Sequence, residues 1–525
     1  MPTEIGSWSG VANAPCFAVH GALVYNPVTD TWKVMLFGGG AEANSPPTGA
    51  KDLRKSYLWD PASQEFSSQD FTLLDASDLA DPFCAHHCLL PDGRLLVMGG
   101  SIYGGPHGKG IRTAWIFNPV TESWSRADDM AFERWYPTSV MLSDGKVLVA
   151  SGRPATAAPI PEMEVFDPVT DAWTTLPSGA NKSLAIYPSL HLVPAGPHAG
   201  KVFYTGARWA GGSGRNSWSP PDTALFNATA NTWSDVGAHV VDNRTEGFSV
   251  LLPPAECARF LVFGGGVTAS DGDPDSAEVI DLLATSPQWE RVPDMHHERT
   301  NVTGVVLPNG GVFVFGGHDT YKWDASNGAD HHVYVCEIYD PSTTGWVETA
   351  RMAKPRQYHS VGILLPDGRV LCAGGVFPGA SPRDQENMEI FSPPYMNEPS
   401  RPSISSAPAS IDYGICFDVG TAETAPIDRV VLIRPMAVTH HTDSEQRYVG
   451  LRFRVMNDST LQVDSPDSGA LAPPGYYMLF LVDAYGTPSV ARFIRVGKPD
   501  VEPLKEDVLV LLLELLEVLH SDEAD

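Results

Sequence analysis

The chain has 525 residues, which is too long for one ordinary hydrophobic core and long enough for a large repeat domain with a companion. Its 45 prolines and 48 glycines are spread among valine, tryptophan and phenylalanine residues, which indicates many short strands joined by tight turns. The 63 acidic and 35 basic side chains give a formal net charge of -28. Such a charge repels phosphate backbones and anionic lipid, so nucleic acid and membrane surfaces are not the partners we expect.

The cysteines and the N-terminal residues indicate where in the cell the protein is expected. The seven cysteines are odd in number and contain no Cys-x-x-Cys pair, so neither a zinc site nor a dense disulfide framework is predicted. Residues 1–8 have neither a basic segment nor an apolar segment of a secretory signal, so the chain as numbered is expected to be cytoplasmic. The cysteines are Cys16, Cys84, Cys88, Cys257, Cys336, Cys372 and Cys416.

A repeat runs through the first three quarters of the chain. Apolar strands end at a glycine every 52 to 61 residues, close to the kelch repeat of about 50 residues. Most of these strands are followed by an aromatic residue, a polar turn and a tryptophan, as in Phe117 to Trp124, and we expect each tryptophan to pack between blades. Seven closures predict a seven-bladed all-β propeller over residues 1–395. The closing glycines are Gly39, Gly100, Gly152, Gly206, Gly265, Gly317 and Gly375.

The last blade is predicted to be completed by the N-terminus. Residues 388–391 form a strand that is followed by Ser392-Pro393-Pro394-Tyr395 and no tryptophan-bearing strand. The segment from Ile5 to Trp8 resembles the missing outer strand, and pairing it there would close the ring and hide two free edges. Trp32 follows an Asn-Pro turn and is predicted to be a turn residue outside the tryptophan series.

The pattern changes after the Pro/Ser-rich stretch 392–408. Short strands without the 50-residue period predict a small β-sandwich over residues 400–497. The acidic tail 498–525 contains an apolar segment, 508–519, interrupted by Glu514 and Glu517. At ~12 residues this segment is too short for a bilayer, which needs ~20. A helix docked on its own chain is expected, and a homo-oligomer contact or an interfacial anchor is the alternative.

Three reactive residues occupy one position of the repeat. Cys84, Tyr136 and His359 each precede by eight residues the aspartate of an Asp-Gly turn, and the three aspartates are Asp92, Asp144 and Asp367. In a propeller this position starts the innermost strand and faces the central axis. We therefore expect these residues and the neighbouring Tyr358 to meet at one mouth of the axis.

Four short motifs carry a family resemblance. In chain order they are Phe83-Cys84, Arg134-Trp135-Tyr136, Arg356-Gln357-Tyr358-His359-Ser360 and Val438-Thr439-His440. Together, inside a seven-repeat chain, they resemble the galactose oxidase and glyoxal oxidase family of mononuclear copper-radical oxidases. The likeness extends from about residue 5 to residue 497, and it implies a kelch propeller followed by an immunoglobulin-like, early-set sandwich.

The resemblance implies a copper site. Tyr136 would be an equatorial copper ligand joined through its ring to the sulfur of Cys84, a thioether that lowers the ring's oxidation potential and makes it a built-in radical cofactor. Tyr358 would be the axial tyrosine, and His359 and His440 the imidazole ligands. Adjacent residues on a strand point to opposite faces, so Tyr358 and His359 can share one ion only if a loop begins there.

The reaction implied is oxidation of a primary alcohol or hydrated aldehyde, with O2 reduced to hydrogen peroxide. Tyr358 would take the hydroxyl proton, and the Tyr136 radical would take a hydrogen atom from carbon. No flavin or nicotinamide is expected, because the chain has no convincing strand, Gly-x-Gly-x-x-Gly, helix unit. The family also implies an extracellular location, against the cytoplasmic one expected from residues 1–8.

The chain departs from galactose oxidase in two respects. No tryptophan follows Tyr136 in the stretch 152–156, where galactose oxidase has one that shields its thioether tyrosine, and Trp135, Trp209 and Trp218 are the candidates to replace it. The chain as numbered also begins at the propeller, without the carbohydrate-binding domain of galactose oxidase. We therefore expect a small aldehyde or another primary alcohol as substrate, in place of galactose.

Two other functions are compatible with parts of the sequence. A kelch-type binding scaffold would use Cys84 as a buried apolar residue and Tyr136 as a packing aromatic. A carbohydrate-binding protein would expose aromatic residues on its blade loops, for which Tyr103, Trp209 and Trp218 are available. Further histidines are expected as neighbours of the site, with His87 the one expected to line it; they are His86, His87 and His441.

We expect truncation from Asp507 onward to leave catalysis intact, because no site motif lies beyond His440. Association or membrane binding alone should change. Peroxide assays and light scattering on the truncated and full chains check this, and loss of turnover in a well-folded truncation would show that the tail contributes to the site.

Overall fold

The structure is a computed structural model. It describes residues 5–38, 55–71, 80–102, 109–154, 158–206, 222–241, 244–266, 273–319, 331–376, 385–424 and 426–497. Several predicted features lie outside these residues: the tail helix, the closure at Gly39, and the aromatic residues Tyr103, Trp209 and Trp218. No helix in the described ranges is long and apolar enough to cross a membrane.

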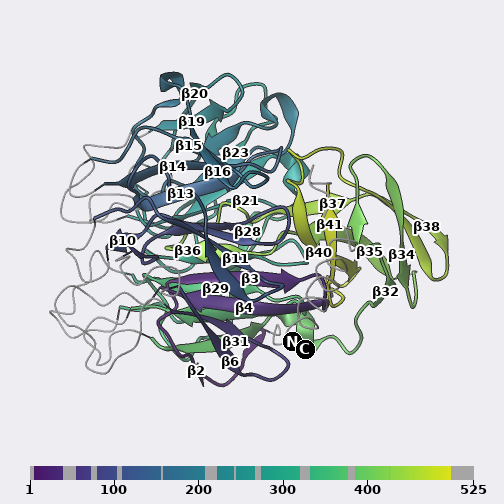
Figure 1. Cartoon of the computed structure of the whole chain (residues 1–525). Helices are drawn as coiled ribbons and strands as arrows, with labels where there is room; N and C mark the ends of the chain where they lie inside the picture. Colours follow the sequence, from purple (N-terminus) through teal and green to yellow (C-terminus); the bar gives the residue numbers. More distant parts are fainter. Residues whose placement is uncertain are drawn as a thin grey trace, which may run out of the picture.

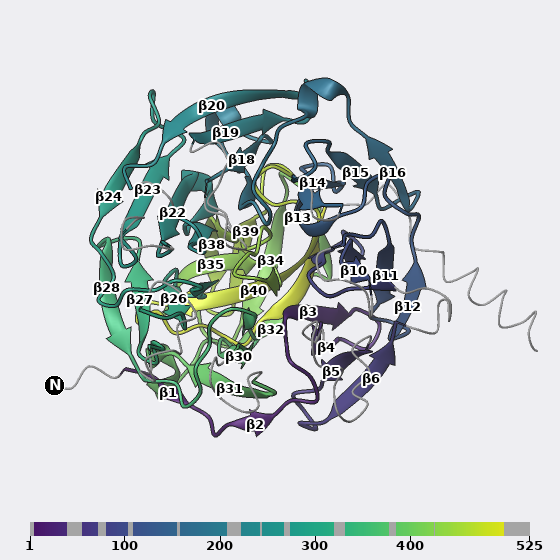
Figure 2. The same ribbon diagram turned by 90° about the vertical axis from the view of Figure 1, so that its left-hand side faces the viewer.

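Seven antiparallel sheets stand around one axis as the blades of a propeller in the described part of the chain, which confirms the predicted fold class (Figure 2). Five of them have four strands, and the first and the last gain a fifth strand each. From the axis outward, each blade has an inner, a second, a third and an outer strand. The inner strands are β3 (His20–Asn26), β8 (His86–Leu89), β13 (Trp135–Met141), β17 (Leu190–Leu192), β21 (Phe248–Leu251), β25 (Thr303–Val306) and β29 (Ser360–Leu364). The second strands are β4 (Thr31–Phe37), β9 (Leu95–Met98), β14 (Val147–Arg153), β18 (Val202–Tyr204), β22 (Arg259–Phe263), β26 (Val312–Phe315) and β30 (Val370–Gly374).

The third and outer strands complete the blades. The third strands are β5 (Lys55–Trp59), β11 (Ala114–Asn118), β15 (Glu164–Asp167), β19 (Asp222–Asn227), β23 (Ala277–Asp281), β27 (Cys336–Asp340) and β31 (Asn387–Ser392). The outer strands are β6 (Phe66–Asp70), β12 (Ser123–Arg126), β16 (Ala172–Thr175), β20 (Thr232–Ala238), β24 (Trp289–Val292), β28 (Gly345–Thr349) and β1 (Ser7–Trp8). A short ribbon on blade two joins β7 (Ala80–Asp81) to β10 (Ser101–Ile102).

The ring is closed by its first residues, as the sequence predicts. Strand β1 pairs antiparallel with β31, Trp8 opposite Phe391, and β2 (Ala12–Asn13) extends the same edge. Figure 2 shows β1 and β2 running along the outside of β31. The indole of Trp8 packs on Phe391 with ring centroids 5.1 Å apart and donates a hydrogen bond to Ala350 of blade six. The N-terminal segment therefore joins two blades besides covering an edge.

The outer-strand tryptophans connect successive blades. Each buries an apolar ring and donates its indole N–H to the preceding blade, which satisfies a polar group that would otherwise be lost in the packing. The donors and acceptors are Trp124 to Ser56, Trp173 to Asp128, Trp233 to Ala180, Trp289 to Thr223 and Trp346 to Pro293. Trp32 differs from the prediction, because the turn ends at Asp30 and Trp32 lies in β4, opposite Tyr25. It is outside the tryptophan series, as expected, but it is a strand residue.

Two packed sheets form the C-terminal sandwich beside the propeller (Figure 1). The first contains β32 (Ile404–Ser406), β34 (Cys416–Thr421), β39 (Thr460–Asp464) and β38 (Phe453–Asn457). The second contains β33 (Ser410–Ile411), β41 (Arg492–Val496), β40 (Gly475–Asp483), β35 (Ile427–Ile433) and β37 (Tyr448–Leu451). Four single-turn 3-10 helices lie in the described loops, at Ser178–Ala180, Gly196–His198, Ala255–Cys257 and Pro394–Asn397.

One strand of the C-terminal region lies inside the propeller. Strand β36 (Ala437–Thr439) leaves the sandwich and pairs antiparallel with the inner strand β3, with Thr439 opposite His20. Figure 1 shows β36 among the blades, away from the other strands of its own region. Polar residues on either side of β36 bind inner strands of the blades. Arg434 donates to the Leu89 carbonyl, Arg447 donates to the Leu192 carbonyl, and Glu445 accepts from the Met141 N–H. The segment 434–447 is therefore fixed at both ends within the propeller.

Deleting residues 1–10 should lower the melting temperature and promote aggregation, because the deletion exposes the β31 edge and removes Trp8. The single change Trp8→Ala tests the packing alone, and truncations of this kind cost about 3–5 kcal/mol. Thermal melts and light scattering measure both effects. An unchanged melt for the deletion would contradict ring closure by β1.

Candidate active site

Six blades place one residue of unusual backbone conformation at the mouth of the axis. Each of these residues stands at or just before the start of an inner strand and has a φ between 45° and 65°. Non-glycine residues adopt this left-handed conformation at a cost of about 1–2 kcal/mol, so its recurrence indicates that the surrounding fold imposes it. The six are Cys84, Tyr136, Tyr187, Glu246, Asn301 and His359, which we call the mouth ring.

The mouth ring is linked by backbone hydrogen bonds that pass from blade to blade. The Tyr136 N–H donates to the Cys84 carbonyl at 3.1 Å, and the Tyr187 N–H donates to the Tyr136 carbonyl at 3.0 Å. On the other side of the ring, the Asn301 N–H donates to the Glu246 carbonyl at 2.9 Å. These bonds fix the height of neighbouring residues relative to one another. Side chains distant in sequence are thereby held at one level of the axis.

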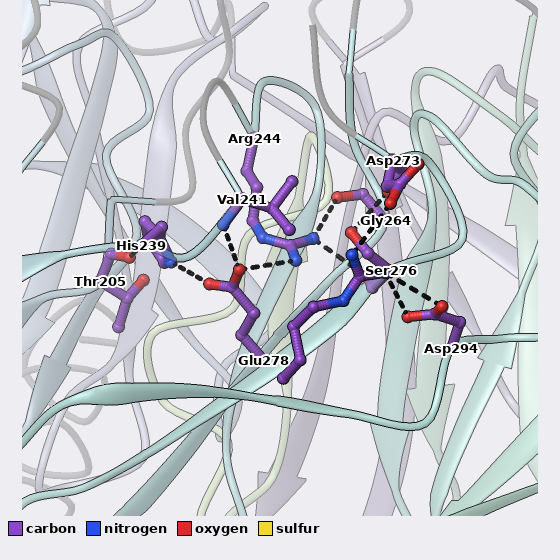
Figure 3. A network of polar contacts seen from close by, with 10 residues as sticks. Thr205, His239, Val241, Arg244, Gly264, Asp273, Ser276, Glu278 and Asp294 are labelled. Carbon is purple, nitrogen blue, oxygen red and sulfur yellow. Dashed lines mark hydrogen bonds and ion pairs between the residues drawn. The ribbon is translucent and has the colours of Figure 1, made fainter.

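Buried ion pairs hold the backbone beneath the ring. In four blades an arginine two or three residues before the ring position meets a glutamate of the third strand, and all eight side chains are at most 1% exposed. Figure 3 shows one pair, Arg244 and Glu278, with Glu278 also accepting from His239 and the Val241 N–H. Burial alone would raise the pKa of Glu278, but His239 and Arg244 bring it below its ordinary value. The pairs are Arg134–Glu164, Arg244–Glu278, Arg299–Glu337 and Arg356–Glu389.

The same arginines explain the glycines that close the second strands. Arg134 donates to the Ser151 carbonyl, and the next residue, Gly152, has a φ of 87°. A Cβ on Gly152 would lie 2.9 Å from the Cβ of Arg134, so a side chain there would displace the arginine. Arg299 and Arg356 donate likewise to the carbonyls before the closures at Gly317 and Gly375. The periodic glycine and the buried arginine are therefore parts of one motif.

His440 reaches the ring from the sandwich region. It follows β36 directly, is 2% exposed, and its Nδ1 lies 2.7 Å from the Thr439 hydroxyl. Because that hydroxyl donates to the Val19 carbonyl, it must accept from His440, which assigns the imidazole proton to Nδ1. The Nε2 lone pair is then directed into the ring, available to a metal ion.

The nitrogen and sulfur atoms are close enough to share one ion. His440 Nε2 lies 2.9 Å from His359 Nε2 and 3.5 Å from Cys84 Sγ, and the three form a group whose donor atoms all fall within 4.8 Å of one another. Two ligands at right angles and about 2.0 Å from an ion lie about 2.8 Å apart. The separation of the two imidazoles is thus that of neighbouring ligands of one metal.

The two tyrosines complete the donor set. The hydroxyls of Tyr136 and Tyr358 lie 2.5 Å apart, and the Tyr136 ring centroid is 5.0 Å from that of His440. Tyr358 and His359 lie in the turn before β29, and the φ of 65° at His359 lets the neighbouring rings stack at 3.7 Å. The predicted loop at this point is therefore present. Two imidazoles with phenol oxygens form a donor set that suits Cu(II).

Burial keeps the donors in their neutral forms in the metal-free protein. It raises the pKa of Tyr136 and of Tyr358 well above the ordinary phenol value, an effect reinforced at both by the nearby Cys84. It also lowers the pKa of His359 and of His440 well below that of free imidazole. Neutral imidazoles offer their lone pairs to a cation without first losing a proton.

Cys84 is in contact with the oxygen-bearing end of Tyr136. The thiol is fully buried, and burial raises its pKa well above the ordinary value, while hydrogen bonding to Tyr136 acts in the opposite direction. Cys84 and the Tyr136 ring belong to one buried cluster, which a crosslink between them would require.

Trp135 covers the other side of the Tyr136 ring. The two rings stack at 3.9 Å with 18° between their planes. Neighbours on a regular strand point to opposite faces, and the φ of 64° at Tyr136 removes this restriction. Of the three candidate tryptophans, Trp135 is the one within the described residues, and it stacks on Tyr136.

The other predicted histidines lie farther from the donors. His441 is bound through Nδ1 to Thr303, and His86 through Nδ1 to Ser139. His87 lies against His20, with ring centroids 5.2 Å apart, and His20 in turn lies 5.9 Å from His440. His20, which the sequence did not single out, thus stands between His87 and the donor set.

Three mouth-ring residues were missed in the sequence. Tyr187 begins a Tyr-Pro-Ser segment 51 residues after the Tyr-Pro-Thr at Tyr136, a signal that the sequence contained. Its ring packs 4.6 Å from Tyr136, and its hydroxyl donates to Ala85. Glu246 and Asn301 follow Arg244 and Arg299 by two residues, the spacing of Arg134 and Tyr136. A search for residues two positions after a repeated arginine would have found both.

Comparisons with known proteins agree with this architecture. Residues 401–496 match the galactose oxidase-like early set domain, and residues 82–131 match the kelch motif. A galactose oxidase of Gibberella zeae is 27% identical over 456 residues, and the aldehyde oxidase GLOX of Vitis pseudoreticulata is 28% identical over 477 residues, 80% of this chain and 82% of that protein. The chain is related to the galactose oxidase and glyoxal oxidase family.

The similarity covers most of this chain but only part of the length of some relatives. The chain spans 63% of the length of the Gibberella galactose oxidase, which in turn matches 83% of the chain. A solved fungal alcohol oxidase in complex with copper covers 94% of this chain and is itself covered completely, with a TM-score of 0.77 at 21% identity. That likeness establishes the fold shared with a structurally characterised oxidase.

Removing the carboxylate under the ring should be far more costly than removing one at the surface. Glu164→Ala leaves the Arg134 guanidinium buried without its partner, and such losses cost about 3–5 kcal/mol. Glu122→Ala breaks the surface pair with Lys33 and should cost about 0–1 kcal/mol. Denaturant unfolding compares the two. Equal losses would show that the buried pair does not support the ring.

Proposed function

We propose that the protein is a copper-dependent oxidase that converts a primary alcohol or an aldehyde to the aldehyde or acid, with O2 reduced to hydrogen peroxide. The observation that supports this proposal is the convergence of five residues from three blades and the sandwich region. Cys84 and His359 each lie within hydrogen-bonding distance of His440, and Tyr136 lies within that distance of Tyr358. The rings of the two tyrosines are 5.0 and 5.5 Å from that of His440. A binding scaffold has no need of four buried metal donors beside a buried thiol.

The copper would be held by the two imidazole Nε2 atoms and the two tyrosine oxygens. When bound, it would supply one-electron redox chemistry and lower the pKa of the phenols that bind it. Burial at the mouth excludes bulk water from the ring and so strengthens each electrostatic contact there. His440 is oriented for this role by Thr439, through the proton on Nδ1.

The two tyrosines would divide the work of substrate oxidation. Oxidation of an alcohol removes a hydroxyl proton, a hydrogen atom from carbon and one further electron, and O2 takes up two electrons and two protons. Tyr358, as phenolate, is the proposed base for the hydroxyl proton. Tyr136 is the proposed acceptor of the hydrogen atom, since sulfur substitution by Cys84 lowers the oxidation potential of its ring. Trp135, stacked on that ring, would keep solvent and reductants from the radical.

Copper and oxygen should convert the purified chain to a form lighter by two hydrogens. The Cys84 S–H and a ring C–H of Tyr136 are lost as the carbon–sulfur bond forms, and O2 takes both hydrogens to become peroxide. Because thiols do not open a thioether, a Cys84 peptide should remain joined to a Tyr136 peptide after denaturation and reduction. Intact-mass and peptide mass spectrometry detect both changes.

Two variants separate the thioether from the metal. Cys84→Ala should bind copper through Tyr358, His359 and His440 while losing the visible absorption of the radical and most peroxide production. Tyr136→Phe should lose the same activity by removing the phenol. The oxidase proposal fails if the copper-loaded, oxidised wild type keeps a free Cys84 and makes no peroxide from a panel of primary alcohols and aldehydes.

A further inference from the structure

Glu246 is the mouth-ring residue whose role the proposed reaction leaves open. It has the same left-handed backbone as Tyr136 and His359, with a φ of 62°. Its backbone is locked by the hydrogen bond from Asn301 and stands above the buried Arg244–Glu278 pair. Its side chain is therefore directed from the same level of the axis as the proposed copper donors.

Among the residues that the structure describes, the Glu246 carboxylate forms no ion pair. Arg244, the nearest arginine in sequence, is committed to Glu278 and to the Gly264 and Ser276 carbonyls, as Figure 3 shows. One carboxylate oxygen of Glu246 accepts from Asn301 Nδ2 at 2.9 Å. The other oxygen has no hydrogen-bond partner among the described residues, although the side chain is half-buried. A half-buried carboxylate held by a neutral amide is costly to the fold, so a ligand role is the simpler explanation.

The carboxylate is oriented by a polar network on the neighbouring blade. Asn301 Nδ2 also lies 3.3 Å from His318 Nε2, and His318 is bound to the Thr300 hydroxyl. Burial raises the pKa of Tyr358 first of all, and the charge of Glu246 is among the further causes of that rise. Geometry places the same blade beside Tyr358, because Thr303, two residues after Asn301, binds His441, whose ring centroid lies 6.4 Å from that of Tyr358. Glu246, held by Asn301, therefore stands at the same mouth of the axis as Tyr358.

We propose that Glu246 selects hydrated aldehydes over simple alcohols by accepting a hydrogen bond from the second hydroxyl of the hydrate. This inference rests on the proposed oxidase function. A primary alcohol, R–CH2OH, has a single hydroxyl, which the copper and Tyr358 would hold. A hydrated aldehyde, R–CH(OH)2, keeps a second O–H donor on the reacting carbon, and the free carboxylate oxygen of Glu246 is an acceptor for it. No bond to carbon is made or broken by Glu246, so it is a specificity residue.

Two ligands that differ by this one hydroxyl test the proposal directly. Trifluoroacetaldehyde hydrate and trifluoroethanol share the fluorinated group, and fluorine NMR line broadening measures the binding of each to the metal-free protein. At about pH 8 the wild type should bind the diol roughly 10-fold more tightly than the alcohol, the gain expected from one hydrogen bond to a charged group. Glu246→Gln keeps the shape of the side chain and should lose most of that preference. Glu290→Gln, an exposed change on the outer strand of the same blade, should keep it.

Turnover by the copper-loaded protein provides the second measurement. In Glu246→Gln, kcat/KM for acetaldehyde should fall roughly 10-fold while kcat/KM for ethanol stays near the wild-type value. A wild type that makes peroxide, together with a Glu246→Gln variant of normal melting temperature and unchanged preference in both measurements, overturns the role of Glu246 and leaves the oxidase intact. A wild type that makes no peroxide from either substrate overturns the oxidase itself.

Discussion

The buried arginine–glutamate pair is the interaction on which the site depends. It is repeated under four of the seven blades, where the arginine clamps the carbonyl before the closing glycine and the glutamate fixes the arginine. A charged side chain buried inside a blade is tolerated only when it is paired and fully hydrogen-bonded. The pair in turn anchors the backbone two or three residues before four of the six left-handed positions of the mouth ring. The Arg134–Glu164 pair thereby holds Tyr136 at the mouth of the axis.

The left-handed backbone also explains how side chains from one short segment can serve one site. A strand would send Trp135 and Tyr136, or Tyr358 and His359, to opposite faces of a blade. The positive φ at Tyr136 and at His359 stacks each pair instead, so that a single turn delivers a donor and the ring that packs on it. The strain is distributed over six blades and is offset by the hydrogen bonds that connect them.

Much of this organisation could be predicted from the sequence because it is periodic. The periodic glycines and tryptophans predict the number of blades. The absence of a tryptophan-bearing strand after Phe391 predicts that the segment with Trp8 closes the ring. The eight-residue spacing to the Asp-Gly turns predicts that Cys84, Tyr136 and His359 lie together. Tyr187 was missed because its blade has a longer turn, Pro194-Ala195-Gly196, in place of Asp-Gly. The stacking of Trp135 could not be predicted, since it follows from a backbone angle that no residue pattern specifies. Trp32 was placed in the turn because the turn signal overlaps the first residues of β4.

Strand β36 has a consequence for how the molecule is assembled. The proposed ligand His440 follows β36, a strand that is synthesised after all seven blades and yet pairs with β3, the first inner strand of the ring. The propeller interior is therefore completed last, by a segment whose own sheet partners lie outside it. Metal binding and the docking of the sandwich on the propeller are then thermodynamically linked. The free energy by which metal binding stabilises the docked state equals the free energy by which docking strengthens metal binding. An ion held between His359 and His440 would join residues 81 positions apart and act as a cross-link between the two halves of the protein.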